Sequence, residues 1–157
     1  MKKKIIALVP VRKGSERVKN KNIKPFGDTS LLKLKLEILK RVSGIDEIIV
    51  NSDCEDMLKL AKENQVSIFK RDEYYARSII NNSDFFEHIA QNCEDDSVIM
   101  YSPVTCPFIK ISTFENAIKQ FKQFKDHNSL TSAFLVNHHM WRNGKPINYE
   151  PYKTPSS

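Results

Sequence analysis

The chain has 157 residues, of which 40% are hydrophobic and nine are phenylalanine, a composition that excludes a disordered protein and predicts one globular domain. Its net charge of +6 and isoelectric point near 9.2 favour an anionic partner, such as a nucleotide, a nucleic acid or a membrane surface. The apolar runs are too short to span a bilayer, and the basic N-terminus has no small-residue cleavage site. Three scattered cysteines without a CxxC pair are typical of reduced cytosolic thiols. We therefore expect a cytoplasmic protein with no membrane partner.

The first half of the chain alternates apolar runs with amphipathic segments. The pattern predicts strands at 5–11, 47–50 and 66–69, and helices at 29–42 and 55–64. The first helix should bury one face formed by Leu31, Leu34, Ile38 and Val42, with Leu32 and Leu39 beside it. Gly44 stands where a left-handed cap would follow that helix, and Ser52 or Asp53 is expected to cap the second.

The same alternation continues to residue 136. We expect a helix at 84–93 capped by Ser83 or Asp84, and strands at 98–102 and 129–136. Ser112 and Glu115 have the spacing of a capping box at the start of another helix, whose apolar face carries Phe114, Ala117, Ile118 and Phe121. Strands that alternate with helices predict a mostly parallel sheet in a three-layer α/β/α sandwich. Residues 1–142 are expected to form the functional domain and 143–157 a proline-rich irregular tail, either a loop or an extended arm.

A basic loop follows the first predicted strand. The stretch VPVRKGSERVKNKN, residues 9–22, carries five cations, which are Arg12, Lys13, Arg17, Lys19 and Lys21. Ligands bind at the carboxyl ends of the strands in open parallel sheets, so the loop lies where a ligand site is expected. Backbone N–H groups of Gly14 and Ser15 and the side chains of Arg12, Arg17 and Lys21 suit the oxygens of a triphosphate. Neither GxxxxGK[ST] nor GxGxxG is present, and charge alone leaves open a solvated lysine-rich loop.

Polar residues also follow two other predicted strands. Asn51, Ser52 and Asp53 come after the second strand, and Ser102 and Thr105 stand between prolines after the fourth. The alternative role of Asp53 is to cap the next helix, and that of the two prolines is to turn the chain. Three polar loops at one sheet edge nevertheless strengthen the expectation of a site there.

The opening segment resembles the signature of the acylneuraminate cytidylyltransferases, the CMP-sialic acid synthetases. Their pattern of an apolar strand, R-x-G-S-x-R, K-N and an apolar-proline segment corresponds here to Arg12, Gly14, Ser15, Arg17, Lys21 and Asn22. Weaker similarities are NSD with Asp53, FKRDEYYARS with Arg71, NNSD with Ser83, and VTCP where the family often has PTSP. The resemblance covers residues 4 to about 140. It implies a Rossmann-like sheet of the nucleotide-diphospho-sugar transferase type.

The resemblance also implies an activity. The family transfers CMP from CTP to the anomeric hydroxyl of a nine-carbon α-keto acid sugar, with release of pyrophosphate, and contributes to the synthesis of surface polysaccharides. By resemblance, Arg12, Gly14, Ser15, Arg17, Lys21, Asn22, Arg71 and Ser83 would bind the nucleotide, and Arg12, Lys21 and Asp53 would be catalytic. Asp53 would also hold Mg²⁺ or Mn²⁺. Thr105, His138 and His139 would meet the acidic sugar, although the two histidines are equally well interpreted as a loop pair with one side chain packed.

The chain departs from the family in two respects. Pro103 replaces a glutamine that meets the sugar, which leaves legionaminic, pseudaminic or 3-deoxy-octulosonic acid as alternative acceptors. Family members continue well past this length, and their later part supplies an acidic metal-binding pair and a dimerisation arm. We therefore expect a fragment, a natural truncation or a variant of a protein whose full-length relatives are homodimers.

Two other functions compete with the enzyme. One is a domain that binds CTP but has weak or no catalytic activity. The other is a basic nucleic-acid-binding domain, which would interleave aromatic residues with its basic ones. The basic loop has no aromatic residue before Phe26, so we expect no nucleic acid as partner.

Overall fold

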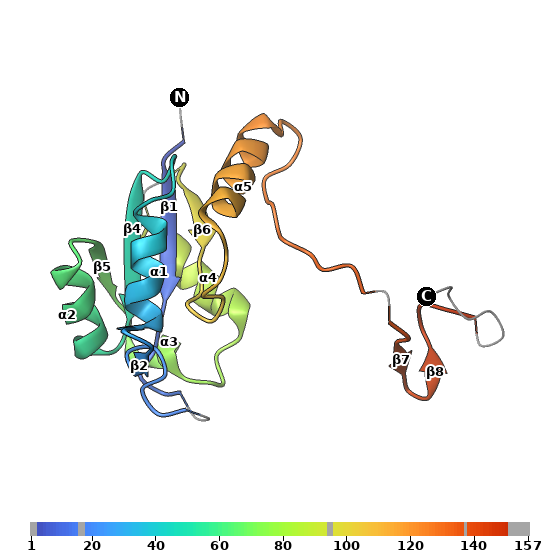
Figure 1. Ribbon diagram of the computed structural model, residues 1–157, viewed down its shortest axis with the longest axis horizontal. Coiled ribbons are helices and arrows are strands. Elements are labelled where there is room, and N and C mark those ends of the chain that lie inside the picture. Colours follow the sequence, from blue (N-terminus) through green and yellow to red (C-terminus); the bar gives the residue numbers. More distant parts are fainter. Residues whose placement is uncertain (1–2, 16–17, 94–95, 137, 151–157) are drawn as a thin grey trace. The chain divides into compact units, whose positions relative to one another are not determined.

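The computed structural model describes residues 3–15, 18–93, 96–136 and 138–150, and the chain divides into two compact units, residues 1–124 and 125–157. The first unit contains a four-stranded parallel sheet in the order β5-β4-β1-β6 (Figure 1). Its strands are β1 (Ile5–Pro10), β4 (Glu47–Ser52), β5 (Ser67–Lys70) and β6 (Val98–Tyr101). Two short strands, β2 (Pro25–Phe26) and β3 (Thr29–Ser30), form a separate antiparallel pair.

β1 is one of the two inner strands of the sheet and pairs with both β4 and β6. Its residues 5–9 are at most 3% exposed, because β4 and β6 flank it and helices cover the sheet. Leu8 lies in register with Ile49 of β4 and Tyr101 of β6. The three strands therefore end close together, and the loops that leave them emerge at the same edge.

Helices lie on both faces of the sheet, which confirms the three-layer α/β/α fold. Figure 1 shows α1 (Leu31–Leu39) and α2 (Glu55–Glu63) in front of the sheet, whereas α4 (Asn82–Gln91) lies behind it. The first unit also contains the short α3 (Glu73–Ala76), which was not expected, and α5 (Ile111–Gln123). Phe114 and Ile118 of α5 join the buried core as predicted.

The buried face of α1 differs from the predicted one. Leu31, Leu34 and Ile38 are only partly buried, whereas Leu32, Lys35, Leu36 and Leu39 are at most 1% exposed. The helix is thus rotated about its axis by about one residue relative to the prediction. This rotation places Leu32, Leu36 and Leu39 in the core, together with Lys35. A buried lysine was not expected from the sequence.

Three helix caps also differ from prediction. α2 begins after Cys54 with no side-chain cap, while Ser52 Oγ accepts a bond from the Cys54 amide at 3.1 Å. α4 begins two residues earlier than predicted, because the side chain of Asn81 caps it. The capping box at Ser112 is not formed, since α5 begins one residue before it and the Glu115 carboxylate accepts a bond from the Ser43 amide.

The second unit contains a hairpin of β7 (Trp141–Arg142) and β8 (Lys145–Pro146). Asn143 and Gly144 connect the two strands with φ of 51° and 72°, the left-handed conformation that an Asn-Gly hairpin turn adopts. The strand predicted at 129–136 is wrong, because these residues have no strand pairing in the described structure and are exposed. An extended segment becomes a strand only when a neighbour pairs with its backbone. The functional division expected after residue 142 stays a prediction.

Across the described ranges, the structure contains no helix of the length and apolar character required to cross a membrane.

Gly44 provides a test of the packing between α1 and α5. Its φ is +91°, and an added Cβ would lie 3.3 Å from Cγ2 of Ile118. We expect Gly44→Ala to lower the free energy of unfolding by about 1–2 kcal/mol, because a left-handed conformation is costly for a residue with a Cβ. Chemical denaturation measures this loss. Gly14→Ala is the control, because its added Cβ would have open space around it, and an equal loss in both variants would contradict the prediction.

Candidate functional site

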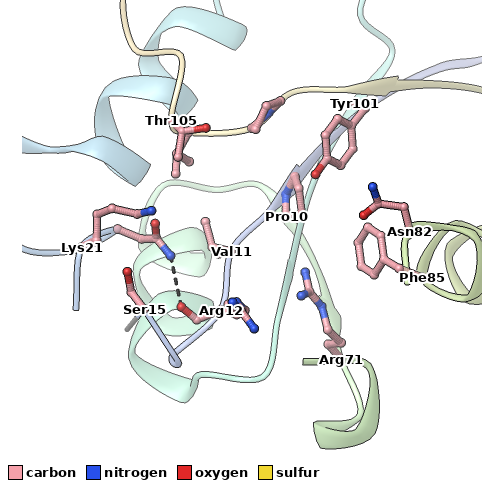
Figure 2. Close-up of a pocket in the computed structure, with 13 residues that line it drawn as sticks. Pro10, Val11, Arg12, Ser15, Lys21, Arg71, Asn82, Phe85, Tyr101 and Thr105 are labelled. Carbon is pink, nitrogen blue, oxygen red and sulfur yellow. Dashed lines mark hydrogen bonds between the residues drawn. The ribbon is translucent and has the colours of Figure 1, made fainter. Parts of the chain in front are cut away.

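A cavity of about 390 Å³ lies at the carboxyl ends of β1 and β6. The chain runs from β1 outward to β4 and β5 and then returns to place β6 on the other side of β1. Such a reversal of strand order is where open α/β sheets bind ligands. The cavity is lined by Pro10, Val11, Arg12, Ser15, Lys21, Asn22, Arg71, Asn82, Phe85, Tyr101, Pro103, Val104 and Thr105 (Figure 2).

Backbone hydrogen bonds hold the basic loop where it leaves β1. The Val11 amide donates to the Asn51 carbonyl at 3.0 Å, and the Lys13 amide donates to Oδ1 of Asp53 at 3.0 Å. The loop returns at Asn22, which is 5% exposed and whose side-chain amide donates to the Arg12 carbonyl at 3.2 Å (Figure 2). The described parts of the loop are thus fixed at both ends.

The loop presents two cations to the cavity. Arg12, Ser15 and Lys21 line one side of it (Figure 2). One guanidinium nitrogen of Arg12 donates to the Ala76 carbonyl at 2.9 Å, which orients the side chain. Lys13 and Lys19 are exposed and lie outside the lining.

Arg71 forms the opposite wall. Its Nε donates to Oδ1 of Asn51 at 2.6 Å, its Nη2 donates to the Asn51 carbonyl at 3.1 Å, and its guanidinium lies 4.7 Å from the ring centre of Phe85. The pKa of Arg71 is lowered to about 10, mainly by burial; Asp53 and Tyr101 oppose this shift, and the neighbouring charge of Arg12 adds to it. Arg71 is still a cation at neutral pH, so three positive side chains surround the cavity.

The structure brings together half of the site residues expected from the sequence. Arg12, Ser15, Lys21, Asn22, Arg71 and Thr105 all line the cavity. Ser83 lies in the first turn of α4 beside the lining residue Asn82, and Gly14 lies in the loop but outside the lining. Arg17 falls outside the described residues. His138 and His139 belong to the second unit, and their roles stay predictions.

Among the lining residues that sequence reasoning missed are the polar or aromatic side chains of Asn82, Phe85 and Tyr101. Tyr101 ends β6, so the rule that strand ends form the site could have identified it. Asn82 was missed because α4 begins two residues earlier than predicted. Phe85 could not be identified from the sequence, because its place in the site depends on its contact with Arg71, which is not a neighbour along the chain.

The described residues contain no cluster of side chains that could hold a metal by themselves. No group of three His, Cys, Asp or Glu side chains in the described ranges is arranged to hold an ion. Asp53, the predicted metal ligand, lies outside the cavity lining, and one of its oxygens accepts the bond from the Lys13 amide. In this structure Asp53 thus helps to position the basic loop, and its catalytic and metal-binding roles stay predictions.

Behind the Arg71 wall lies a stack of aromatic rings. The ring of His88 lies parallel to that of Tyr75 at a centroid distance of 4.0 Å and 5.3 Å from that of Phe69. Its Nε2 is buried and has no hydrogen-bond partner among the described residues. Burial lowers the pKa of His88, and the positive charge of Arg71 lowers it further.

Comparisons with known proteins agree with this geometry. A family model described as Cytidylyltransferase matches residues 6–143. N-acylneuraminate cytidylyltransferase of Escherichia coli O18:K1:H7 is 26% identical over 138 residues, which cover 87% of this chain and 33% of that protein. The chain thus spans about a third of this curated relative.

Two solved structures share the fold. CMP:2-keto-3-deoxy-manno-octonic acid synthetase complexed with CTP matches with a TM-score of 0.66 at 14% identity, over 76% of this chain and 48% of that chain. A cytidylyltransferase from Leptospira borgpetersenii matches with a TM-score of 0.65 at 25% identity, over 80% and 51%.

The partly buried His88 predicts a pH dependence. Because its pKa is lower in the folded state than in the unfolded state, unfolded chains bind more protons as the pH falls below about 6.5. The contribution of His88 to stability is therefore present at neutral pH and is lost as the pH falls through that value. We expect His88→Phe, which keeps an aromatic ring on Tyr75, to lose less stability than the wild type between pH 7.5 and 5. Urea denaturation across this range measures the difference, and parallel curves would contradict the prediction.

Proposed function

Because the chain belongs to the cytidylyltransferase family, we propose that its cavity binds CTP and that the protein transfers CMP from CTP to an acidic sugar, releasing pyrophosphate. The supporting observation is the charge of the cavity. Its lining contains the three cations Arg12, Lys21 and Arg71 and, among the described residues, no carboxylate. A triphosphate supplies the complementary charge.

The proposed reaction breaks one bond and forms one at the α-phosphorus of CTP. The sugar hydroxyl oxygen attacks the phosphorus and gives up its proton to water, and the bond to the oxygen of pyrophosphate breaks as the pyrophosphate leaves. Such a transfer depends mainly on alignment and on neutralising the phosphate charge. Arg12 and Lys21 would supply that neutralisation. The Ala76 carbonyl orients the Arg12 guanidinium, and Asn22 holds the Arg12 backbone.

The far wall of the cavity suits the nucleoside. Phe85 and Tyr101 present aromatic rings, and Arg71 is held against Phe85 by its two bonds to Asn51. Aromatic and guanidinium planes are surfaces on which a base can stack. We assign Arg71 and, one residue from the lining, Ser83 to the nucleotide side, and Thr105 to the acceptor side.

A divalent ion enters the proposal only as a companion of the triphosphate. Mg²⁺ commonly binds proteins through substrate phosphates and one or two carboxylates. The described residues offer no cluster of ligands for it. Mg²⁺ or Mn²⁺ would therefore be carried by CTP, and its charge would add to that of Arg12 and Lys21.

We also propose an acceptor and a compartment for the reaction. The acceptor would be a sialic-type nine-carbon α-keto acid, with 3-deoxy-octulosonic acid or a related sugar as the alternative. The cytoplasm would be the site of the reaction. A second candidate function is CTP binding with weak or no transfer, which is favoured by the lack of an acidic cluster among the described residues.

Calorimetric titration with CTP, ATP, GTP and UTP, each with and without Mg²⁺, tests the proposal. We expect CTP with Mg²⁺ to bind most tightly, because the cavity combines cations that suit phosphates with a wall of aromatic side chains that suits the base. Equal weak binding of all four would leave only a non-selective phosphate patch. Pyrophosphate release with CTP and a panel of sugar acids then separates the enzyme from the binding-only candidate.

Substitutions in the basic loop test the roles of its cations. Arg12→Ala and Lys21→Ala should each weaken CTP binding by about 1.5–3 kcal/mol, as expected for hydrogen bonds to charged groups. Lys13→Ala and Lys19→Ala are matched controls, because both side chains are exposed and lie outside the lining. The same titration measures all four variants. Four equal small losses would indicate diffuse attraction and would contradict a built site.

A further inference from the structure

Lys35 is a charged residue on the buried side of α1. Its side chain is 0% exposed, and it lies beside Leu36 and one turn from Leu32 and Leu39 in the core. Removing an ammonium group from water is costly unless other groups compensate for the lost hydration. Burial accordingly lowers the pKa of Lys35.

The contacts of Lys35 are with one loop and one ring. Its Nζ donates to the carbonyl oxygen of Cys106 at 2.8 Å and lies 5.3 Å from the ring centre of Phe114. No ion pair with a carboxylate is found for it within the described part of the chain. An apolar side chain of similar length would fill this place without the cost of burying a charge. Packing alone therefore gives no reason for a lysine here.

The loop that Lys35 contacts forms part of the cavity. It leaves β6 at Ser102, whose amide donates to the Leu8 carbonyl at 2.8 Å, and it lines the cavity with Pro103, Val104 and Thr105. Val104 is 2% exposed and anchors the middle of the loop in the core. The next anchor along the chain is the bond from Lys35 to Cys106, directly after the exposed Thr105.

We propose that Lys35 is a positioning residue of this site, whose buried ammonium holds the Cys106 carbonyl and thereby fixes Pro103, Val104 and Thr105 against the bound ligand. A bond from an ammonium group is stronger than one from a neutral donor, and the low-polarity surroundings strengthen it further. Four methylene groups let the nitrogen reach from α1 across the core to the loop. Lys35 acts through the loop backbone and touches neither the cavity nor the reacting atoms.

Variants at position 35 separate this role from packing. Lys35→Met keeps the length and removes the donor, whereas Lys35→Arg keeps both the charge and the donors. Lys33→Met, on the exposed side of the same helix, is the matched control for charge. Hydrogen exchange of the amides in 102–109 reports the loop, the thermal midpoint reports global stability, and calorimetry with CTP and Mg²⁺ reports the site.

We expect Lys35→Met to unfold cooperatively, to exchange faster in 102–109 than elsewhere, and to bind CTP at least about tenfold more weakly. Lys35→Arg should restore affinity to within about threefold of the wild type, and Lys33→Met should change neither loop exchange nor affinity. If Lys35→Met does not fold, Lys35→Leu replaces it, because its apolar side chain also has no donor for the Cys106 carbonyl.

Unchanged loop exchange and CTP affinity in Lys35→Met or Lys35→Leu would overturn the proposal. Equal weakening by Lys33→Met would also overturn it, because the effect would then come from net charge. The binding readout rests on the proposed CTP site, whereas the exchange readout needs no nucleotide. A wild-type chain that binds no CTP would refute the proposed function, and exchange in 102–109 would still decide whether Lys35 holds the loop.

Discussion

The pairing of β1 with β4 on one side and β6 on the other is the constraint on which the rest of the molecule depends. Because β1 is apolar and covered on both faces, it can occupy only the interior of the sheet. Its register then brings the ends of three strands to one edge. The basic loop, the turn at Asp53 after β4 and the loop after Ser102 therefore meet at this edge.

The described residues place three cationic side chains and no carboxylate around the cavity at this edge of the sheet. Arg12, Lys21 and Arg71 face or border one cavity, and Asp53, the nearest carboxylate expected there, is engaged with the Lys13 amide. Hydrogen bonds from Arg71 to Asn51 and from Lys35 to Cys106 use neutral oxygens to hold cations in place. The positive potential is therefore left for a ligand to neutralise, which is how a preorganised anion site differs from a network of salt bridges.

The sequence predicted the features that depend on local pattern. A continuous apolar run followed by Arg12 was sufficient to locate β1 and the site loop, because both follow from periodicity and strand-end rules. The role of Asp53 could not be predicted, since its partner lies 40 residues away along the chain. Lys35 was missed because lysines are almost always exposed. The strand at 129–136 was predicted from composition, which cannot supply the neighbour that a strand requires.

The exposed segment 129–136 has a consequence for the behaviour of the protein in solution. Phe134 is 84% and Leu135 78% exposed, within a stretch that has no charged residue. Such a stretch is a template for self-association, which the net charge of +6 opposes by mutual repulsion. Added salt screens that repulsion but leaves the apolar contact intact. Colloidal stability should therefore fall with ionic strength, so low-salt buffers suit concentrated samples of this chain.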